Sequence, residues 1–351
     1  MKKKSLPAKK TIRRKLIKFL NNGIVSKNYN LFKKNFNQFC FEKKVLVAIS
    51  GGPDSLALSY FVKCLSLEKK ITPYFFIVDH KLRSNSTKEA NFVKNNLRKF
   101  DITCRILTWS GKKPKSNIQS IARQNRYLLL SKQCLKNDIK TILLAHHEDD
   151  LYENFFIRIL RGSGLQGIVS FYDVKAKLDD KIELLRPLLN TKKSELEYIS
   201  NKVFKFFVKD PSNEDDSYKR IRLRKLIKQL KYEGLDLRKL KLTIKNLKDS
   251  NKSINYFVSQ NINRNSSCLS KNKKYILSSK FFDKPNEIVF RSFSQILKQT
   301  SKKYYSPRGK SISKLLEHIY DGTFKKQTLS GCSIEKLGNS MIIQTEKPKK
   351  S

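Results

Sequence analysis

The sequence contains few cysteines, and none of them is spaced like a metal ligand. Only 6 cysteines occur in 351 residues, and no two of them form a C-x-x-C pair. Paired cysteines are the usual signature of zinc sites and of many redox sites. We therefore expect buried or incidental free thiols, as in a protein of a reducing compartment.

Long apolar runs are also missing. No run approaches the ~20 residues that a helix needs to cross a bilayer. The lysine-rich N-terminus is not followed by the apolar core of a signal peptide, and it has too few serines for an organellar transit peptide. We expect no membrane partner and a cytoplasmic location.

Acidic residues are scarce relative to basic ones. The chain has 30 Asp and Glu against 75 Lys and Arg, which gives a net charge of +45 and predicts a polyanionic partner, most simply nucleic acid. An AT-biased genome, rich in lysine and asparagine codons, accounts for part of this excess but not for its clustering. Residues 1–25 contain no acid. They predict a mobile basic arm or an amphipathic helix that contacts phosphates, with a solvated tail as the alternative.

The stretch from Val45 to Leu58 has the pattern of a strand, a tight loop and a helix. A continuous apolar run ends at Ser50-Gly51-Gly52-Pro53-Asp54-Ser55, and apolar residues then recur at helical spacing. Glycines bring bare N–H groups close to a ligand, and the serines and the helix N-terminus add donors, so the loop suits a pyrophosphate. It is neither a Walker loop nor G-x-G-x-x-G.

Asp54 is unexpected in a loop of this kind. A carboxylate beside a polyphosphate is repulsive unless a cation lies between them, so Asp54 predicts bridging Mg²⁺. The alternative is an ordinary Gly-Gly turn with Asp54 as the N-cap of a helix.

From residue 45 to about 200, apolar runs alternate with helical segments. The predicted strands are 45–50, 73–79, 102–108 and 139–145, and the predicted helices are 54–68, 87–100, 117–136 and 148–161. This alternation predicts an α/β domain with a doubly wound parallel sheet, whose ligands bind beyond the carboxyl ends of the strands.

Polar residues follow two of these strands at that edge. Asp79 and His80 end the second strand, and His146 comes after the fourth. Asp150 and Glu153 then share a helix face with His146, which predicts a Mg²⁺-binding and proton-handling edge opposite Asp54. Zinc is a competing interpretation, although no H-E-x-x-H pattern appears, and a solvated acidic helix start is the plain alternative.

Taken in order, these motifs resemble the N-type ATP pyrophosphatases and, among them, the tRNA(Ile)-lysidine synthetases. The matching motifs are Ser-Gly-Gly-Pro-Asp-Ser at 50–55, Val-Asp-His-Lys-Leu-Arg at 78–83, Ala-Arg-x-x-Arg-Tyr at 122–127, Leu-Ala-His-His-Glu-Asp-Asp at 144–150, Arg-Gly-Ser-Gly-Leu-x-Gly at 161–167, Arg-Pro-Leu-Leu at 186–189 and Asp-Pro-Ser-Asn at 210–213, followed by Arg220-Ile221-Arg222. Their order holds from residue 40 to 225, which makes chance a poor explanation.

The resemblance implies a Rossmann-like fold of the adenine nucleotide alpha hydrolase type and a two-step reaction on an isoleucine tRNA with a CAU anticodon. The first anticodon cytidine is adenylated by ATP, and free lysine then replaces AMP at C2. The implied ATP-binding residues are 50–55 with Asp79 and His80, and the implied Mg²⁺ ligands are Asp54, Asp150 and Glu153. Implied catalytic residues are Asp54, Arg126, His146, Asp150 and Glu153.

Two of these roles concern charge. Arg126 and His146 are expected as cationic donors to the phosphates, and Glu153 or Asp150 as acceptor of the lysine proton. The family usually has Gln and then Glu-Thr after the two aspartates, whereas this chain has Leu151, Tyr152, Glu153 and Asn154. Glu153 matches the glutamate of the family, so the loss of Gln and Thr is expected to affect fine positioning in the site and not the type of reaction.

The remaining sequence is divided by its composition. We expect a basic extension at 1–40, the catalytic domain at 41–218, a basic helical region at 219–287 and a small α+β domain at 288–351 that, by resemblance, binds tRNA. Residues 250–285 are weakly patterned and are expected to be partly loop. Helices are predicted near 289–299 and 309–320, and strands near 327–334 and 340–344. A homodimer is compatible with the sequence.

Three other functions fit the sequence less well. A tRNA thiolase of the same superfamily would bring paired cysteines, which are absent. An amide-forming relative would bring a glutaminase partner and would not need this basic surface. A non-enzymatic RNA-binding protein would explain the charge but would leave the strand-end residues without a role.

Overall fold

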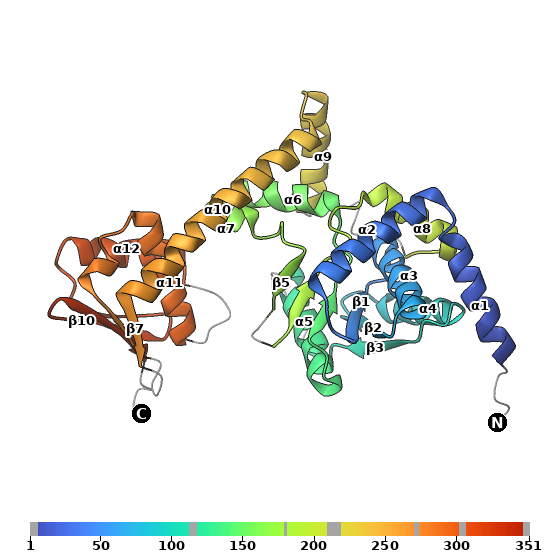
Figure 1. Cartoon of the computed structure of the whole chain (residues 1–351), viewed down its shortest axis with the longest axis horizontal. Coiled ribbons are helices and arrows are strands. Elements are labelled where there is room, and N and C mark those ends of the chain that lie inside the picture. The colour runs from blue at the N-terminus through green and yellow to red at the C-terminus, as the bar shows by residue number, and fades with distance from the viewer. Residues whose placement is uncertain are drawn as a thin grey trace. The chain divides into compact units, whose positions relative to one another are not determined.

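The computed structural model describes residues 6–111, 118–178, 181–208, 219–269, 274–301 and 307–346, with side chains from Lys10 onward. It divides the chain into two compact units, Met1–Lys239 and Leu240–Ser351. Figure 1 shows their elements, and each unit is described by itself.

A six-stranded sheet forms the centre of the first unit. Its strands are β1 (Lys44–Ile49), β2 (Thr72–Asp79), β3 (Cys104–Thr108), β4 (Thr141–Leu143), β5 (Lys175–Lys177) and β6 (Glu183–Leu185), in the order β3-β2-β1-β4-β6-β5. All neighbouring pairs are parallel except β5 with β6, which is antiparallel. The predicted doubly wound parallel sheet is confirmed, and β5 and β6 are strands that the sequence did not indicate.

Helices α3 (Pro53–Glu68), α4 (Ser86–Arg98) and α5 (Ile118–Asn137) pack on the sheet, and α8 (Lys193–Phe204) packs on α3. Helix α6 (Glu148–Ile159) contacts α7 (Leu165–Val169) and α9 (Lys219–Tyr232). Val45 and Val47 of β1 pack into one apolar core with α3 and α8, whereas Leu46 packs into a second core with α5. Successive side chains of β1 therefore lie alternately in two buried cores, as its continuous apolar run predicts.

The N-terminal segment is an anchored helix. Helices α1 (Leu6–Phe19) and α2 (Gly23–Phe39) precede the sheet. Leu16 of α1 is fully buried, and its carbonyl accepts a 2.9 Å hydrogen bond from the Tyr60 hydroxyl of α3. Residues 6–19 therefore form a helix packed against α3, as one of the alternatives expected, and its contact with phosphates stays a prediction.

The second unit contains helices and a small antiparallel sheet. Its elements are most of α10 (Leu237–Asn265), β7 (Ser266–Leu269), β8 (Lys274–Leu277), the 3₁₀ turn η2 (Ser279–Phe281), α11 (Asn286–Ser301), α12 (Gly309–Tyr320), β9 (Lys326–Leu329), β10 (Cys332–Leu337) and β11 (Ser340–Thr345). The strand order is β7-β8-β11-β10-β9. The small α+β domain is confirmed, with more strands than expected.

The partly looped segment expected at 250–285 is instead ordered over most of its length. Helix α10 continues to Asn265, and β7 and β8 follow it. The helix is held by polar contacts, since buried Asn261 donates to the carbonyl of Phe281 and to the Ser292 hydroxyl, each at 3.2 Å. Asn251 and Asn261 interrupt the apolar stripe on the buried face of α10, which explains why its second half was expected to be partly loop.

The chain divides differently from the four segments that composition suggested. Helices α1 and α2 belong to the same unit as the sheet, and so does α9, whereas α10 lies mainly in the second unit. None of the helices in the described ranges combines the length and hydropathy needed to cross a bilayer.

Candidate active site

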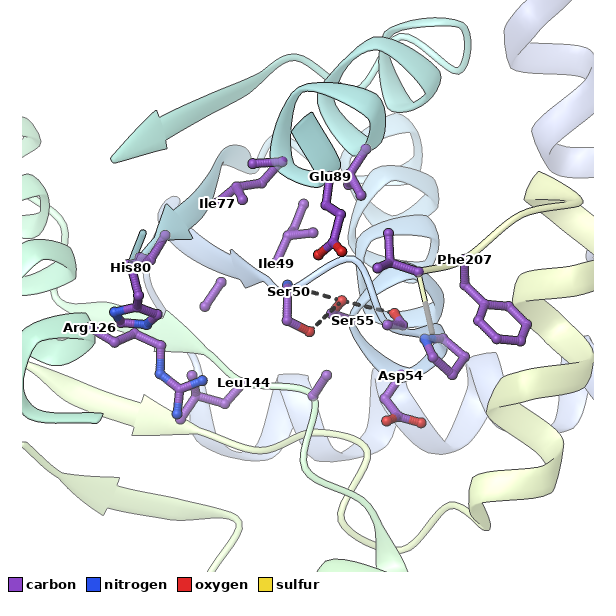
Figure 2. A pocket seen from close by; sticks show the side chains of 18 of the residues that line it. Ile49, Ser50, Asp54, Ser55, Ile77, His80, Glu89, Arg126, Leu144 and Phe207 are labelled. Carbon is purple, nitrogen blue, oxygen red and sulfur yellow. Dashed lines mark hydrogen bonds between the residues drawn. The ribbon is translucent and has the colours of Figure 1, made fainter. Parts of the chain in front are cut away.

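The loop between β1 and α3 has the geometry of a phosphate cradle. Gly51 has φ +86°, and a Cβ there would lie 2.8 Å from Val93 Cγ2, so this position requires glycine. The Ser55 hydroxyl accepts hydrogen bonds from the backbone N–H groups of Ser50 (3.1 Å) and Gly51 (3.2 Å). Figure 2 shows these two serines facing each other beneath the loop. Ser55 therefore shapes the loop from inside.

A cavity of about 820 Å³ opens in front of this loop. It lies beyond the carboxyl ends of β1, β2 and β4, where a doubly wound sheet binds its ligands. Ten of the predicted site residues line it: Ser50, Gly52, Pro53, Asp54, Ser55, Asp79, His80, Arg126, His146 and Asp150. Gly51 and Glu153 do not line it.

His147 connects two of the predicted carboxylates. Its Nε2 lies 3.6 Å from Oδ2 of Asp54 and 3.6 Å from Oδ2 of Asp150. The imidazole is buried between the loop and the start of α6, where the backbone N–H of His147 also donates to Asp150 at 3.0 Å. The structure thus brings Asp54 and Asp150 together, and His147 is a site residue that the sequence alone did not single out.

These two carboxylates differ in acidity. Burial raises the pKa of Asp54 to about 6, and the charge of Asp150 adds to this effect. Burial acts on Asp150 in the same direction, but nearby His147 and its backbone N–H outweigh it and lower the pKa of Asp150. Asp54 is therefore the carboxylate whose ionised form most needs a cation.

The residues fit a magnesium ion that is completed by phosphate oxygens. Oδ1 of Asp54 is buried without a hydrogen-bond partner. Among the described residues, no three His, Cys, Asp or Glu side chains converge as a metal shell. Mg²⁺ is commonly held by one or two carboxylates together with substrate phosphates and water, which matches Asp54 and Asp150 beside the loop.

Glu153 takes a different position from the one predicted. Its Oε1 accepts a 2.6 Å hydrogen bond from Nε of Arg224, and its side chain is 4% exposed. Arg224 lines the cavity, whereas Glu153 lies behind it. The expected group of three carboxylates is thus divided. Arg224 comes from α9, where the sequence predicted only a basic helical region, so its position at the cavity was also missed.

Arg126 and His80 lie together across the cavity from Asp54 (Figure 2). Nε of Arg126 is buried without a partner. Burial lowers the pKa of His80, and the charge of Arg126 lowers it further. An arginine without a carboxylate partner at a cavity wall is suited to bind an anionic ligand.

His146 is not the cation that was expected. Burial lowers its pKa to about 3, so the imidazole is neutral near pH 7. Its ring contacts Phe171 edge-on, with ring centroids 5.0 Å apart. A neutral His146 can still donate or accept one hydrogen bond at the cavity wall.

Asp79 lies at the cavity wall, but its oxygens bond to its own chain. It accepts hydrogen bonds from the backbone N–H of Lys81 (3.0 Å) and from the hydroxyls of Ser86 (2.7 Å) and Thr87 (2.6 Å). Asp79 is 3% exposed. These bonds fix the turn into α4, so the structure gives Asp79 a structural part in addition to the predicted nucleotide contact.

The two residues that depart from the family pattern are Leu151 and Asn154. Leu151 packs with Phe171 and Leu189, so an apolar side chain suits its position. The Oδ1 atom of Asn154 is buried without a hydrogen-bond partner. The Asp-Pro-Ser-Asn motif at 210–213 lies outside the described residues.

Helix α8 adds two cavity residues that the sequence did not indicate. Lys193 and Glu197 line the cavity near Asp54 and approach each other to 3.6 Å. Nothing in the local sequence distinguishes them from other charged residues one helical turn apart.

Comparisons with known proteins identify relatives of this chain. Residues 20–230 match the model of the PP-loop domain. The tRNA(Ile)-lysidine synthase of Wolbachia pipientis wMel is 33% identical over 320 residues, covering 90% of this chain and 74% of that protein. The tRNA(Ile)-lysidine synthase of Rickettsia felis is 32% identical over 330 residues, covering 92% of this chain and 75% of that protein.

A solved structure shares the fold at lower identity. The U34-tRNA thiolase NcsA from Methanococcus maripaludis, solved with its [4Fe-4S] cluster, has a TM-score of 0.55 and 14% sequence identity. The match covers 64% of this chain and 79% of the thiolase. At this identity the likeness describes the fold.

Proposed function

The chain belongs to the PP-loop domain family and, within it, to the tRNA(Ile)-lysidine synthases, and on this basis we propose that it ligates lysine to a cytidine of an isoleucine tRNA. The target is C2 of the cytidine at the first anticodon position of a CAU-anticodon tRNA. ATP is the energy source, and AMP and pyrophosphate are the products. The observation that carries the proposal is the Ser50–Ser55 loop, which opens into the cavity beside Asp54 and Asp150.

The first step forms a bond between the cytidine O2 and the α-phosphorus of ATP and releases pyrophosphate. The backbone of the loop and the N-terminus of α3 bind the leaving pyrophosphate. Asp54 and Asp150 would hold Mg²⁺, and the ion would supply positive charge to neutralise the charge that develops on the phosphates. Arg126 donates to the same phosphates from the opposite wall.

The second step replaces AMP by the lysine side-chain amine at C2. An unperturbed lysine has a pKa near 10.4, so its amine must lose a proton before it attacks. Of the two proposed acceptors, Asp150 lines the cavity, whereas Glu153 is bonded to Arg224. We assign the proton to Asp150, because it is the proposed acceptor whose carboxylate lines the cavity and can meet the lysine amine.

The alternative of a tRNA thiolase lacks chemical support in this site. No cysteine lines the cavity within the described part of the chain. Of the six free cysteines, all but Cys268 are buried. A thiolase needs a sulfur carrier or a cluster next to the adenylated base.

The test is incorporation of labelled lysine into an unmodified CAU-anticodon isoleucine tRNA with ATP and Mg²⁺. A methionine tRNA with the same anticodon is the control. We expect lysine transfer to the isoleucine tRNA alone, with AMP released. Formation of AMP without lysine transfer would contradict the proposed nucleophile and keep the adenylation step. A homodimer and a cytoplasmic location stay predictions.

A further inference from the structure

Five arginines of the first unit gather beside the cavity without carboxylate partners. We call them the arginine cluster: Arg123, Arg126, Arg158, Arg161 and Arg186. In the described ranges, none of them forms an ion pair with Asp or Glu. Buried Arg186 donates only to the backbone carbonyl of Asp173, at 2.9 Å. The positive charges of the cluster are therefore not neutralised by this protein's own acids.

Arg123 lies at the centre of the cluster. Burial, with the charge of Arg123 added, lowers the pKa values of Arg126, Arg158 and Arg186, and Arg161 acts on Arg158 in the same way. Mutual repulsion of this kind disfavours the empty site and is relieved when an anion binds.

Aromatic rings alternate with these guanidinium groups. Arg123 and Arg126 approach the ring of Tyr127, with guanidinium carbons 5.2 Å and 5.7 Å from its centroid. Arg186 lies 4.6 Å from the ring centroid of Phe171, which in turn contacts His146. Planar cations between aromatic rings are typical of surfaces that bind unpaired nucleotides.

The cluster connects the open surface with the cavity. Arg126 and His146 line the cavity, and Figure 2 shows Arg126 at its wall. Arg161 is exposed at the end of α6, where the Gly162–Gly164 loop begins. A Cβ added at Gly162 or Gly164 would meet no atom within 4 Å, so the loop is bordered by free space.

We propose that the arginine cluster binds the phosphodiester backbone of a single-stranded RNA segment and directs its reacting base into the cavity. The inference rests on the proposed function and identifies where the anticodon loop approaches ATP. Of the arginine cluster, a free nucleotide in the cavity would engage only Arg126, because the other four members do not line the cavity. A chain of phosphates accounts for all five cations.

The test compares two double variants of the full-length protein. R158Q/R161Q removes two charges from the cluster without touching the cavity wall. R98Q/R105Q removes two exposed arginines of α4 and β3 and serves as the matched control. The probe is an unmodified anticodon stem-loop of the CAU isoleucine tRNA, titrated at several salt concentrations. Binding of a non-hydrolysable ATP analogue reports whether each variant is folded.

We expect R158Q/R161Q to weaken RNA binding roughly tenfold and to reduce the slope of log K against log salt by about 0.7 per lost phosphate contact. The ATP analogue should bind within twofold of wild type, and R98Q/R105Q should change neither quantity. The R123K variant keeps its charge and should keep the salt slope. RNA binding by R158Q/R161Q equal to that of the control would overturn the proposal.

The outcome separates this inference from the proposed reaction. If R158Q/R161Q weakens RNA binding but wild-type protein transfers no lysine, RNA binding by the cluster is supported and the proposed reaction is refuted. If wild-type protein transfers lysine and R158Q/R161Q does so with an unchanged KM for tRNA, the reaction is supported and RNA binding by the cluster is refuted.

Discussion

Arg224 of α9 donates a 2.6 Å hydrogen bond from Nε to Oε1 of Glu153 in α6, and only the arginine of this pair faces the cavity. Glu153 is 4% exposed and its Oε2 has no hydrogen-bond partner. A buried carboxylate destabilises the fold when the cation paired with it is removed. The pair therefore joins the basic helix α9 to the helix that carries Asp150.

The first prediction concerns this pair. Arg224→Ala leaves the Glu153 carboxylate buried and uncompensated, so the free energy of unfolding should fall by about 2 to 3 kcal/mol, less than for a fully buried pair because Arg224 is one-third exposed. Lys228→Ala removes an exposed cation of the same helix and should change it by no more than about 0.5 kcal/mol. Urea unfolding measures both. If the double variant loses as much free energy of unfolding as Arg224→Ala and Glu153→Gln lose together, the two residues are not coupled.

The second prediction follows from the raised pKa of Asp54. The pKa of Asp54 is about 6 in the folded state and near 3.9 in the unfolded state. Between these two pH values the folded protein therefore binds more protons at Asp54 than the unfolded chain does. Without metal, stability should therefore fall as pH rises from about 4 to about 6. Mg²⁺ binds the ionised form, so it should raise Tm at pH 7.5 and have little effect at pH 5.

Asp54→Asn provides the matched comparison for that experiment. The amide keeps the shape of the side chain and cannot ionise, so the variant should lose the pH-dependent Mg²⁺ effect on Tm. It should also lose adenylation while it still binds tRNA. A Mg²⁺ effect that is the same in wild type and variant at both pH values would remove Asp54 from the metal site.

The sequence predicted the sheet well because strong local patterns define it. The apolar runs of β1 and β2 and the helical spacing of α3 are each readable within a dozen residues. Strands β5 and β6 have three residues each and pair through the sheet, so no local pattern marks them. Only the second half of α10, which falls in the segment expected to be partly loop, was missed, since Asn251 and Asn261 occupy positions on its buried face that apolar residues would otherwise mark.

The sequence predicted which edge of the sheet carries the site, but not which side chains contact one another there. Strand ends and the Gly-Gly loop place Asp54, His146 and Asp150 at one edge of a parallel sheet, which needs only topology. Whether a carboxylate faces the cavity depends on partners distant in sequence. Glu153 meets Arg224, 71 residues away, and no spacing rule connects them. The protonation state of His146 likewise depends on burial that the sequence does not display.

The third prediction concerns the loop itself. Gly51→Ala imposes a side chain at φ +86° and places its Cβ 2.8 Å from Val93 Cγ2. The conformational strain alone costs about 1 to 2 kcal/mol, and the contact adds to it. We expect a lower Tm and at least a tenfold weaker binding of an ATP analogue. Gly23→Ala at the start of α2 meets no atom within 4 Å and should change neither property.

The last prediction separates the two parts suggested for Asp79. Its three hydrogen bonds keep the carboxylate ionised and lower its pKa, although burial acts in the opposite direction. A depressed pKa contributes stability above the unfolded value near 3.9, and this stability is lost as pH falls through the folded-state pKa. Asp79→Asn replaces a charged acceptor with a neutral amide, so at pH 7 it should lower the free energy of unfolding by about 1 to 3 kcal/mol.

If the bonds to Ser86, Thr87 and Lys81 are the main task of Asp79, the variant should bind an ATP analogue within about threefold of wild type once it is folded. Asp101→Asn, which removes an exposed acid paired with Lys63, is the control and should change stability far less. A variant that keeps wild-type stability and loses ATP binding would instead assign Asp79 to the nucleotide.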